Sequence, residues 1–285
     1  MIDFKDKLIE LIDTHSLNHL KDKILSLTEE TIFLKKTVKE DYLKIGSSRL
    51  CGYPDLPKEI EWPVITESGY GYHDDDIGLL KLFLCQVNLE ELPDIGKLPK
   101  KGILYFFLGS NCLWGYGERD SEIYYYPDKL NEVQNLIGKI DKTFFTEGDP
   151  EDKYHLENGY KIEFEKALTI PDENSEIFES LNLSKKDEDK YDELYCDYRN
   201  FLYEKFNKLN MMFGYVDCGG NNLRKNISSY KKLGGEKDWE VIFSIWSDND
   251  TGLNFNDAGN FSFLILNEDL KLMNFDKIET DLWSS

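Results

Sequence analysis

The chain has 285 residues, of which 40% are hydrophobic and 31% are charged, a balance typical of a folded globular protein. Its 55 acidic residues outnumber its 34 basic ones, so the formal net charge is −21. Phosphate backbones and anionic membrane surfaces repel such a chain, which argues against a nucleic-acid partner or a membrane partner. No stretch reaches the roughly 18 apolar residues that a membrane-spanning helix needs.

The N-terminal half is expected to begin with helices and to continue mainly as strands. Residues 3–13 predict an amphipathic helix, because Phe4, Leu8, Leu11 and Ile12 recur at helical spacing. The further elements expected in this half are a helical stretch over 17–27, strands over 31–34, 79–89, 102–109 and 123–126, a short helix over 127–136, and a strand over 160–165.

The clearest helix of the chain is expected over 185–209. Ser184 stands at its start, and apolar and aromatic side chains repeat every three or four residues up to Phe206. Strands over 239–246 and 259–266 follow, and a short helical turn is expected at 268–270. This mixture, with 14% aromatic residues, predicts an α+β protein with largely antiparallel sheets.

The strand-rich unit occurs twice along the chain. Three landmarks recur at offsets of 162, 159 and 157 residues: Gly52 at Gly214, Cys85 at Ser244, and Gly102 at Gly259. Offsets that shrink steadily are what drift in loop length after a duplication produces. We therefore expect a single domain over 1–285, built from two halves at about 31–170 and 171–285. The alternative is coincidence between aromatic strands that begin at glycine.

Several runs of residues form a set that spans most of the chain. They are Gly52-Tyr53-Pro54-Asp55-Leu56-Pro57, Trp62-Pro63, Phe83 to Leu89, Leu98-Pro99-x-x-Gly102, the Trp239 strand, the Asp248-Asn249-Asp250 turn, and Gly259 to Phe263. This set resembles the YwqG-like family of bacterial proteins, a domain of unknown function. The resemblance implies an internally duplicated α+β fold in a cytosolic bacterial protein. It implies no catalytic residue, because the family has no established activity.

Two polar side chains lie on an apolar strand of the first half. Gln86 and Asn88 share a strand face with Leu82 and Leu84, and polar groups in such a place need partners. The favoured interpretation is that they bond the backbone of a neighbouring loop, such as 52–63. The alternative is a ligand site that also includes Trp62. Ile245 is expected where the second half would repeat Gln86, so a site built from both copies would be half missing.

The turn that begins at Asp248 resembles the start of a calcium loop. Asp248, Asp250 and Gly252 place carboxylate oxygens and a turn glycine at suitable spacing. The twelfth position is Gly259 and not an acid, so a solvated hairpin turn is favoured over a divalent-cation site at Asp248 and Asp250. No cofactor is expected.

Cysteine usage and the N-terminus indicate a cytoplasmic protein. The five cysteines are odd in number and form no Cys-x-x-Cys pair, a pattern typical of reduced thiols. Met1 to Lys7 contains acids and no long apolar run, which argues against a secretory signal.

No catalytic cluster stands out in the sequence, so no catalytic residue is assigned and enzyme activity is not favoured. The acidic charge and the aromatic strands favour a non-enzymatic protein-interaction module, one form of which is an immunity-type antidote of a basic protein. The alternative is a protein that binds a small molecule or a divalent cation between the two halves, and a hydrolase with an unrecognised site is the third hypothesis.

Overall fold

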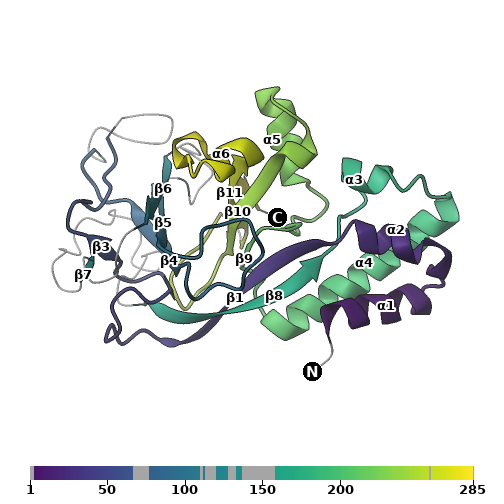
Figure 1. Cartoon of the computed structure of the whole chain (residues 1–285), viewed down its shortest axis with the longest axis horizontal. Helices are drawn as coiled ribbons and strands as arrows, with labels where there is room; N and C mark the ends of the chain where they lie inside the picture. The colour runs from purple at the N-terminus through teal and green to yellow at the C-terminus, as the bar shows by residue number, and fades with distance from the viewer. Residues whose placement is uncertain are drawn as a thin grey trace.

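The computed structural model describes residues 3–66, 77–109, 112, 120–127, 133–136, 158–256 and 258–284 (Figure 1). The strands are β1 (Glu29–Lys39), β2 (Arg49–Leu50), β3 (Asp55–Pro57), β4 (Leu82–Asn88), β5 (Ile103–Leu108), β6 (Ser121–Tyr126), β7 (Val133–Asn135), β8 (Tyr160–Thr169), β9 (Met211–Met212), β10 (Trp239–Trp246), β11 (Asn260–Leu266) and β12 (Glu279–Trp283). The α-helices are α1 (Phe4–Thr14), α2 (Lys21–Ser26), α3 (Glu176–Glu179), α4 (Lys185–Phe206), α5 (Leu223–Lys231) and α6 (Asn267–Lys271). The 3-10 helices are η1 (Asn18–Leu20), η7 (Glu236–Asp238) and η8 (Phe275–Lys277).

Ten of the strands form one antiparallel sheet in the order β12-β11-β10-β9-β1-β8-β2-β4-β5-β6, and β3 pairs with β7 in a separate ladder. The predicted α+β class with largely antiparallel sheets is therefore confirmed. Among the described helices, none combines the length and the apolar character that crossing a membrane requires.

The helical expectations hold at the N-terminus of the chain and at the start of α4, which ends at Phe206 and not at residue 209. Ser184 caps α4, because its hydroxyl accepts a hydrogen bond from the amide of Asp187 at 3.3 Å. The helices α1, α2 and α4 pack beside β1 and β8, at the right of Figure 1. Phe206 at the end of α4 stacks on Phe33 of β1, with ring centroids 4.3 Å apart. The helices thus form their own hydrophobic core with β1.

Two expectations for individual elements need correction. The predicted helix over 127–136 is wrong at its end, because Val133–Asn135 forms β7, while residues 128–132 lie outside the described residues. β7 is extended because β3 pairs with it. The helix α5 was not expected, although Asn222 caps it and Leu223 and Ile227, four residues apart, are both buried.

Read inward from either edge of the sheet, the strands follow the same pattern, because each strand comes earlier in the chain than the one outside it until the centre is reached. β6-β5-β4-β2 leads to β8 from one edge, and β12-β11-β10-β9 leads to β1 from the other. β1 precedes β2 in the chain but pairs with β9, while β8 precedes β9 but pairs with β2. Two copies that exchanged their first strands would produce this order, which is why internal duplication stays a proposal worth testing.

The register corrects the sequence alignment of the two halves by one residue. β4 and β10 each contain an irregularity in their pairing with the next strand, at residue 84 and at residue 242. Two residues beyond it, Gln86 pairs with β2 and Ser244 pairs with β9. Ser244, and not Ile245, is thus the structural counterpart of Gln86. Pairing with the neighbouring strand defines this correspondence, and aligned sequences do not reveal that pairing.

The sheet curls until its two ends share one hydrophobic core. Phe106 of β5 lies 4.6 Å from Phe243 of β10 and 5.4 Å from Phe263 of β11, measured between ring centroids. Phe275 of η8 contacts Tyr125 of β6 at 6.4 Å, so η8 packs between β6 and β11.

Gly214 lies two residues after β9, where the backbone packs closely against side chains of β1 and β8. Its φ is +77°, and a Cβ there would lie 1.9 Å from Oγ1 of Thr31 and 2.5 Å from Oγ1 of Thr169. We predict that Gly214→Ala lowers the free energy of unfolding by about 2–3 kcal/mol. Gly96→Ala is the control, with φ +73° and no atom within 4 Å, and should cost about 1 kcal/mol. Equal losses in urea unfolding would contradict the steric explanation.

Candidate functional site

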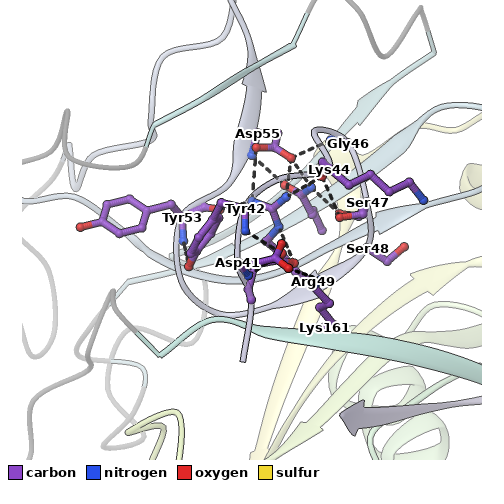
Figure 2. A network of polar contacts seen from close by, with 12 residues as sticks. Asp41, Tyr42, Lys44, Gly46, Ser47, Ser48, Arg49, Tyr53, Asp55 and Lys161 are labelled. Carbon is purple, nitrogen blue, oxygen red and sulfur yellow. Dashed lines mark hydrogen bonds and ion pairs between the residues drawn. The ribbon is translucent and has the colours of Figure 1, made fainter. Parts of the chain in front are cut away.

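Arg49 of β2 lies at the centre of a buried polar network (Figure 2). Its Nη2 donates to Oδ2 of Asp55 at 2.6 Å and its Nη1 to Oδ1 at 3.2 Å, which makes a bidentate ion pair. Nε lies 3.6 Å from Oε2 of Glu40, and the guanidinium carbon lies 4.9 Å from the ring centre of Tyr42. Arg49, Asp55 and Glu40 all have side chains with 0% exposure, so one cation faces two carboxylates in the interior.

A tight reversal of the chain brings Asp55 back to Arg49. Cys51 and Gly52 both have positive φ, at 56° and 79°, and a Cβ on Gly52 would lie 2.1 Å from the hydroxyl oxygen of Tyr42. The returning backbone is also bonded by the guanidinium, because Nη1 of Arg49 donates to the carbonyl of Tyr53 at 2.8 Å. The positive φ at Gly52 is thus part of how the network is assembled.

Residues 41–48 form what we call the clamped loop, because buried or half-buried carboxylates bond its backbone amides. Oε1 of Glu40 accepts from the amides of residues 41 and 42 at 3.0 and 2.9 Å. Oδ2 of Asp55 accepts from the amide of Gly46 at 2.7 Å, and Oε2 of Glu91 from the amide of Ser48 at 2.8 Å. The backbone is therefore held at the start of the loop and at residues 46 and 48.

Gln86 and Asn88 bond the carbonyl groups of the same loop. Nε2 of Gln86 donates to the carbonyl of Ser47 at 2.7 Å, and Nδ2 of Asn88 donates to that of Gly46 at 2.9 Å. Oε1 of Gln86 accepts from the amide of Asp55 at 2.7 Å. The favoured interpretation of these two residues as supports of loop backbone is thus what the structure shows, with residues 46–55 as the segment that they hold. Direct contact with a ligand stays a prediction.

Three apolar side chains in the clamped loop or just before it are exposed to solvent. Leu43 is 85% exposed and Ile45 is 47% exposed, and Val38 at the end of β1 is 64% exposed. In the described part of the chain these are three of seven exposed large hydrophobic side chains, and they fall within eight consecutive residues. Sequence reasoning did not find these three side chains or Arg49. Leu43 and Ile45, the apolar residues on either side of Lys44, were nevertheless a visible signal in the sequence.

Trp62 lies in a different part of the core from Gln86. Its indole Nε1 donates to the carbonyl of Lys81 at 2.8 Å, and its ring packs edge-on against Phe83 and Phe107. Lys81 is itself buried. Burial works against its charge, but hydrogen bonds to Asp120 and Glu122 raise the pKa of Lys81 above its ordinary value. A role for Trp62 in ligand binding stays a prediction.

Asp248 and Asp250, which follow β10, both bond a lysine of β1. Nζ of Lys36 in β1 donates to Asp248 and, at 2.7 Å, to Oδ2 of Asp250, and it lies 4.7 Å from the ring centre of Tyr160. Burial opposes the charge on this ammonium, but the two carboxylates raise the pKa of Lys36 overall. A divalent cation at Asp248 and Asp250 stays a prediction, and it now requires that Lys36 be displaced.

The described residues offer no larger group of metal ligands elsewhere. Among the described residues, no cluster of three or more His, Cys, Asp or Glu side chains could hold a metal ion. The described contacts of Asp248 and Asp250 share no residue with those of Gln86 and Asn88, so the structure does not join the two predicted sites.

The comparison with known proteins concerns the region that begins at the last residue of the clamped loop. A family model described as "Domain of unknown function (DUF1963)" matches residues 48–282, which is more than half of the chain. The match includes Arg49, Asp55, Gln86 and Asn88, and residues 41–47 precede it. No curated protein matches the chain.

Proposed function

The chain belongs to the DUF1963 family, whose function is unknown, and we propose from its structure that it is a non-enzymatic protein-interaction module for a basic partner protein. The clamped loop is the proposed main contact. The observation that supports this most is the contrast at residues 41–48, where the backbone is fixed by buried side chains while Leu43 and Ile45 are left in solvent. The finer resemblance to the YwqG-like family and the internal duplication are part of the same proposal.

A fixed loop with apolar side chains has the energetics of a binding anchor. Burying a leucine side chain contributes about 1.5–3 kcal/mol, and no such gain is realised by Leu43 in the free chain. Because the loop backbone is already bonded at Gly46, Ser47 and Ser48, binding would not have to order it. Binding side chains are often placed on loops that a rigid scaffold positions.

The charge of the chain favours a basic partner. Its formal net charge of −21 attracts cationic surfaces over several ångströms and speeds their encounter with the chain. Within the clamped loop, Asp41 pairs with Lys161 at 2.7 Å and Lys44 pairs with Glu91 at 2.7 Å, and Asp41 is the more exposed acid, at 48% against 29% for Glu91. An exposed pair contributes little to stability, so Asp41 can be shared with a cationic partner at small cost.

Capture from cells of the native host, followed by substitution in the loop, tests the proposal. We expect the full chain to retain a basic protein, and Leu43→Asp to weaken that binding by about 10-fold or more, the equivalent of about 1.4 kcal/mol. Leu272→Asp is the matched control, because Leu272 is 76% exposed and lies far along the chain. Thermal unfolding of both variants should match the parent.

Two outcomes would contradict the proposed function. One is that no protein is captured under low-salt conditions, where electrostatic attraction is strongest. The other is that Leu43→Asp and Leu272→Asp reduce binding equally. The antidote form of the proposal makes a further demand: the captured protein must have an activity that the chain inhibits and that returns with Leu43→Asp.

A further inference from the structure

A cavity of about 150 Å³ lies between the loop that joins β4 to β5 and the central strands. Its floor is formed by Ile32 of β1 and by Phe213, which are 1% and 0% exposed. Its walls come from half-buried side chains of the loop, namely Leu92, Ile95 and Leu98. Apolar groups thus line most of a space that opens to solvent on one side.

We propose that this cavity binds a small aromatic or branched aliphatic carboxylate, with the apolar body in the cavity and the carboxylate at Lys100. This inference is independent of the clamped loop and its protein partner, because none of the cavity's residues belongs to residues 41–48.

The size and lining of the cavity set the apolar part of the ligand. Engineered protein cavities of about 150 Å³ lined by leucine, isoleucine and phenylalanine stay dry and bind benzene. The cavity here has a similar volume and similar apolar side chains, namely Ile32, Leu92, Ile95, Leu98 and Phe213, but it opens to solvent, and Glu90, Asp94 and Lys100 also line it. One ring, or about six carbon atoms of an aliphatic chain, therefore suits it.

Lysines around the same loop set the charge of the ligand. In a chain of net charge −21, Lys97, Lys100 and Lys166 all contact this loop or the floor of the cavity. Lys97 lies 5.1 Å over the ring of Phe213 but is held by Glu240 at 2.8 Å. Lys166 is paired with Glu30. Lys100 is different, because it lines the cavity and its side chain is 80% exposed.

The partner of Lys100 can be exchanged at small cost. Lys100 pairs with Asp94 at 2.7 Å, and both side chains are more than half exposed and line the cavity. Such a surface pair contributes little to stability, so a ligand carboxylate can replace Asp94 as the partner of the ammonium. Asp94 would then turn to solvent, and the ligand would gain both a cation and an apolar pocket.

Titration of the full chain with phenylacetate and with neutral 2-phenylethanol tests the proposal by calorimetry and thermal shift. We expect saturable binding of phenylacetate, and binding of 2-phenylethanol that is about 5-fold weaker or more. Lys100→Gln should reduce phenylacetate affinity about 5-fold and leave the affinity for 2-phenylethanol unchanged. Lys101→Gln is the control, since Lys101 is exposed and does not line the cavity.

Filling the cavity tests its location. Ile95→Phe and Leu98→Phe each place a larger side chain in the space, and either variant that folds like the parent should lose binding of both compounds. Saturable binding by both filled variants would overturn the assignment to this cavity. Failure of the parent chain to bind either compound would overturn the proposal, and equal binding of the two compounds would overturn the role of Lys100. None of these outcomes bears on capture of a protein partner.

Discussion

Arg49→Met is expected to lower the free energy of unfolding by about 3–5 kcal/mol. The substitution removes the guanidinium that pairs with Asp55 and Glu40, whose side chains both have 0% exposure. Carboxylates left in the interior without their cation lose a bidentate ion pair and recover no hydration. Urea unfolding followed by tryptophan fluorescence measures the loss.

Two further variants separate a buried network from a surface pair. Lys44→Met breaks the pair with Glu91, but the side chain of Lys44 is 71% exposed, so the expected loss is less than about 1 kcal/mol. Arg49→Met with Asp55→Asn should cost less than the sum of the single changes, because the second change removes one of the charges that the first leaves unpaired. Additive losses, or an Arg49→Met loss as small as that of Lys44→Met, would show that the network does not stabilise the fold.

The parts of the fold that could be predicted are those where local pattern and final structure agree. The stripe from Tyr191 to Phe206 has helical spacing and a serine cap, and α4 begins and continues as that pattern indicates. The strands β5 and β11 follow glycines and are rich in apolar and aromatic residues. Register was not predictable in this way, because the bulge at residue 84 depends on the neighbouring strand, and a bulge moves every later residue by one.

The candidate site was only partly predictable for the same reason. That Gln86 needed polar partners followed from its place on an apolar strand, but which backbone it bonds depends on the reversal at Cys51 and Gly52. Arg49 and Asp55 are close in sequence, yet only the placement of β2 between β8 and β4 buries them together. The sequence shows Leu43 and Ile45 as apolar residues on either side of Lys44, but their exposure results from how the rest of the loop is held.

Two buried arginines, Arg49 of β2 and Arg224 of α5, bond nearby backbone in a similar way at different positions. Arg224 of α5 donates to the carbonyl of Gly214 at 2.8 Å, as Arg49 does to Tyr53. Arg224 also lies 4.7 Å from the ring centre of Tyr215. The described residues between β2 and β4 form no helix that would correspond to α5. The resemblance therefore reflects a shared need to fix the backbone at a positive-φ glycine, and not a matched sequence position.

The carboxylate that pairs with Arg224 is expected to make stability depend on pH. Nη1 and Nη2 of Arg224 donate to Oε1 and Oε2 of Glu29 at 3.0 and 2.7 Å. Burial raises the pKa of Glu29, but the charge and hydrogen bonds of Arg224 lower it more, so the pKa lies below its ordinary value of 4.5. Glu29→Gln, which leaves Arg224 buried without its anion, is expected to cost about 3 kcal/mol at pH 7.

The sign of the pH dependence follows from the lowered pKa of Glu29. The stability that its ion pair adds is fully present above the unfolded-state value near 4.5 and is lost as the pH falls through the lower folded-state pKa. The difference in unfolding free energy between the parent and Glu29→Gln should therefore be constant from about pH 6 to 8 and should narrow below about pH 4.5. Glu30→Gln is the control, because Glu30 pairs with Lys166 at an exposed site. A difference that widens in acid would show that Arg224 does not hold Glu29 ionised.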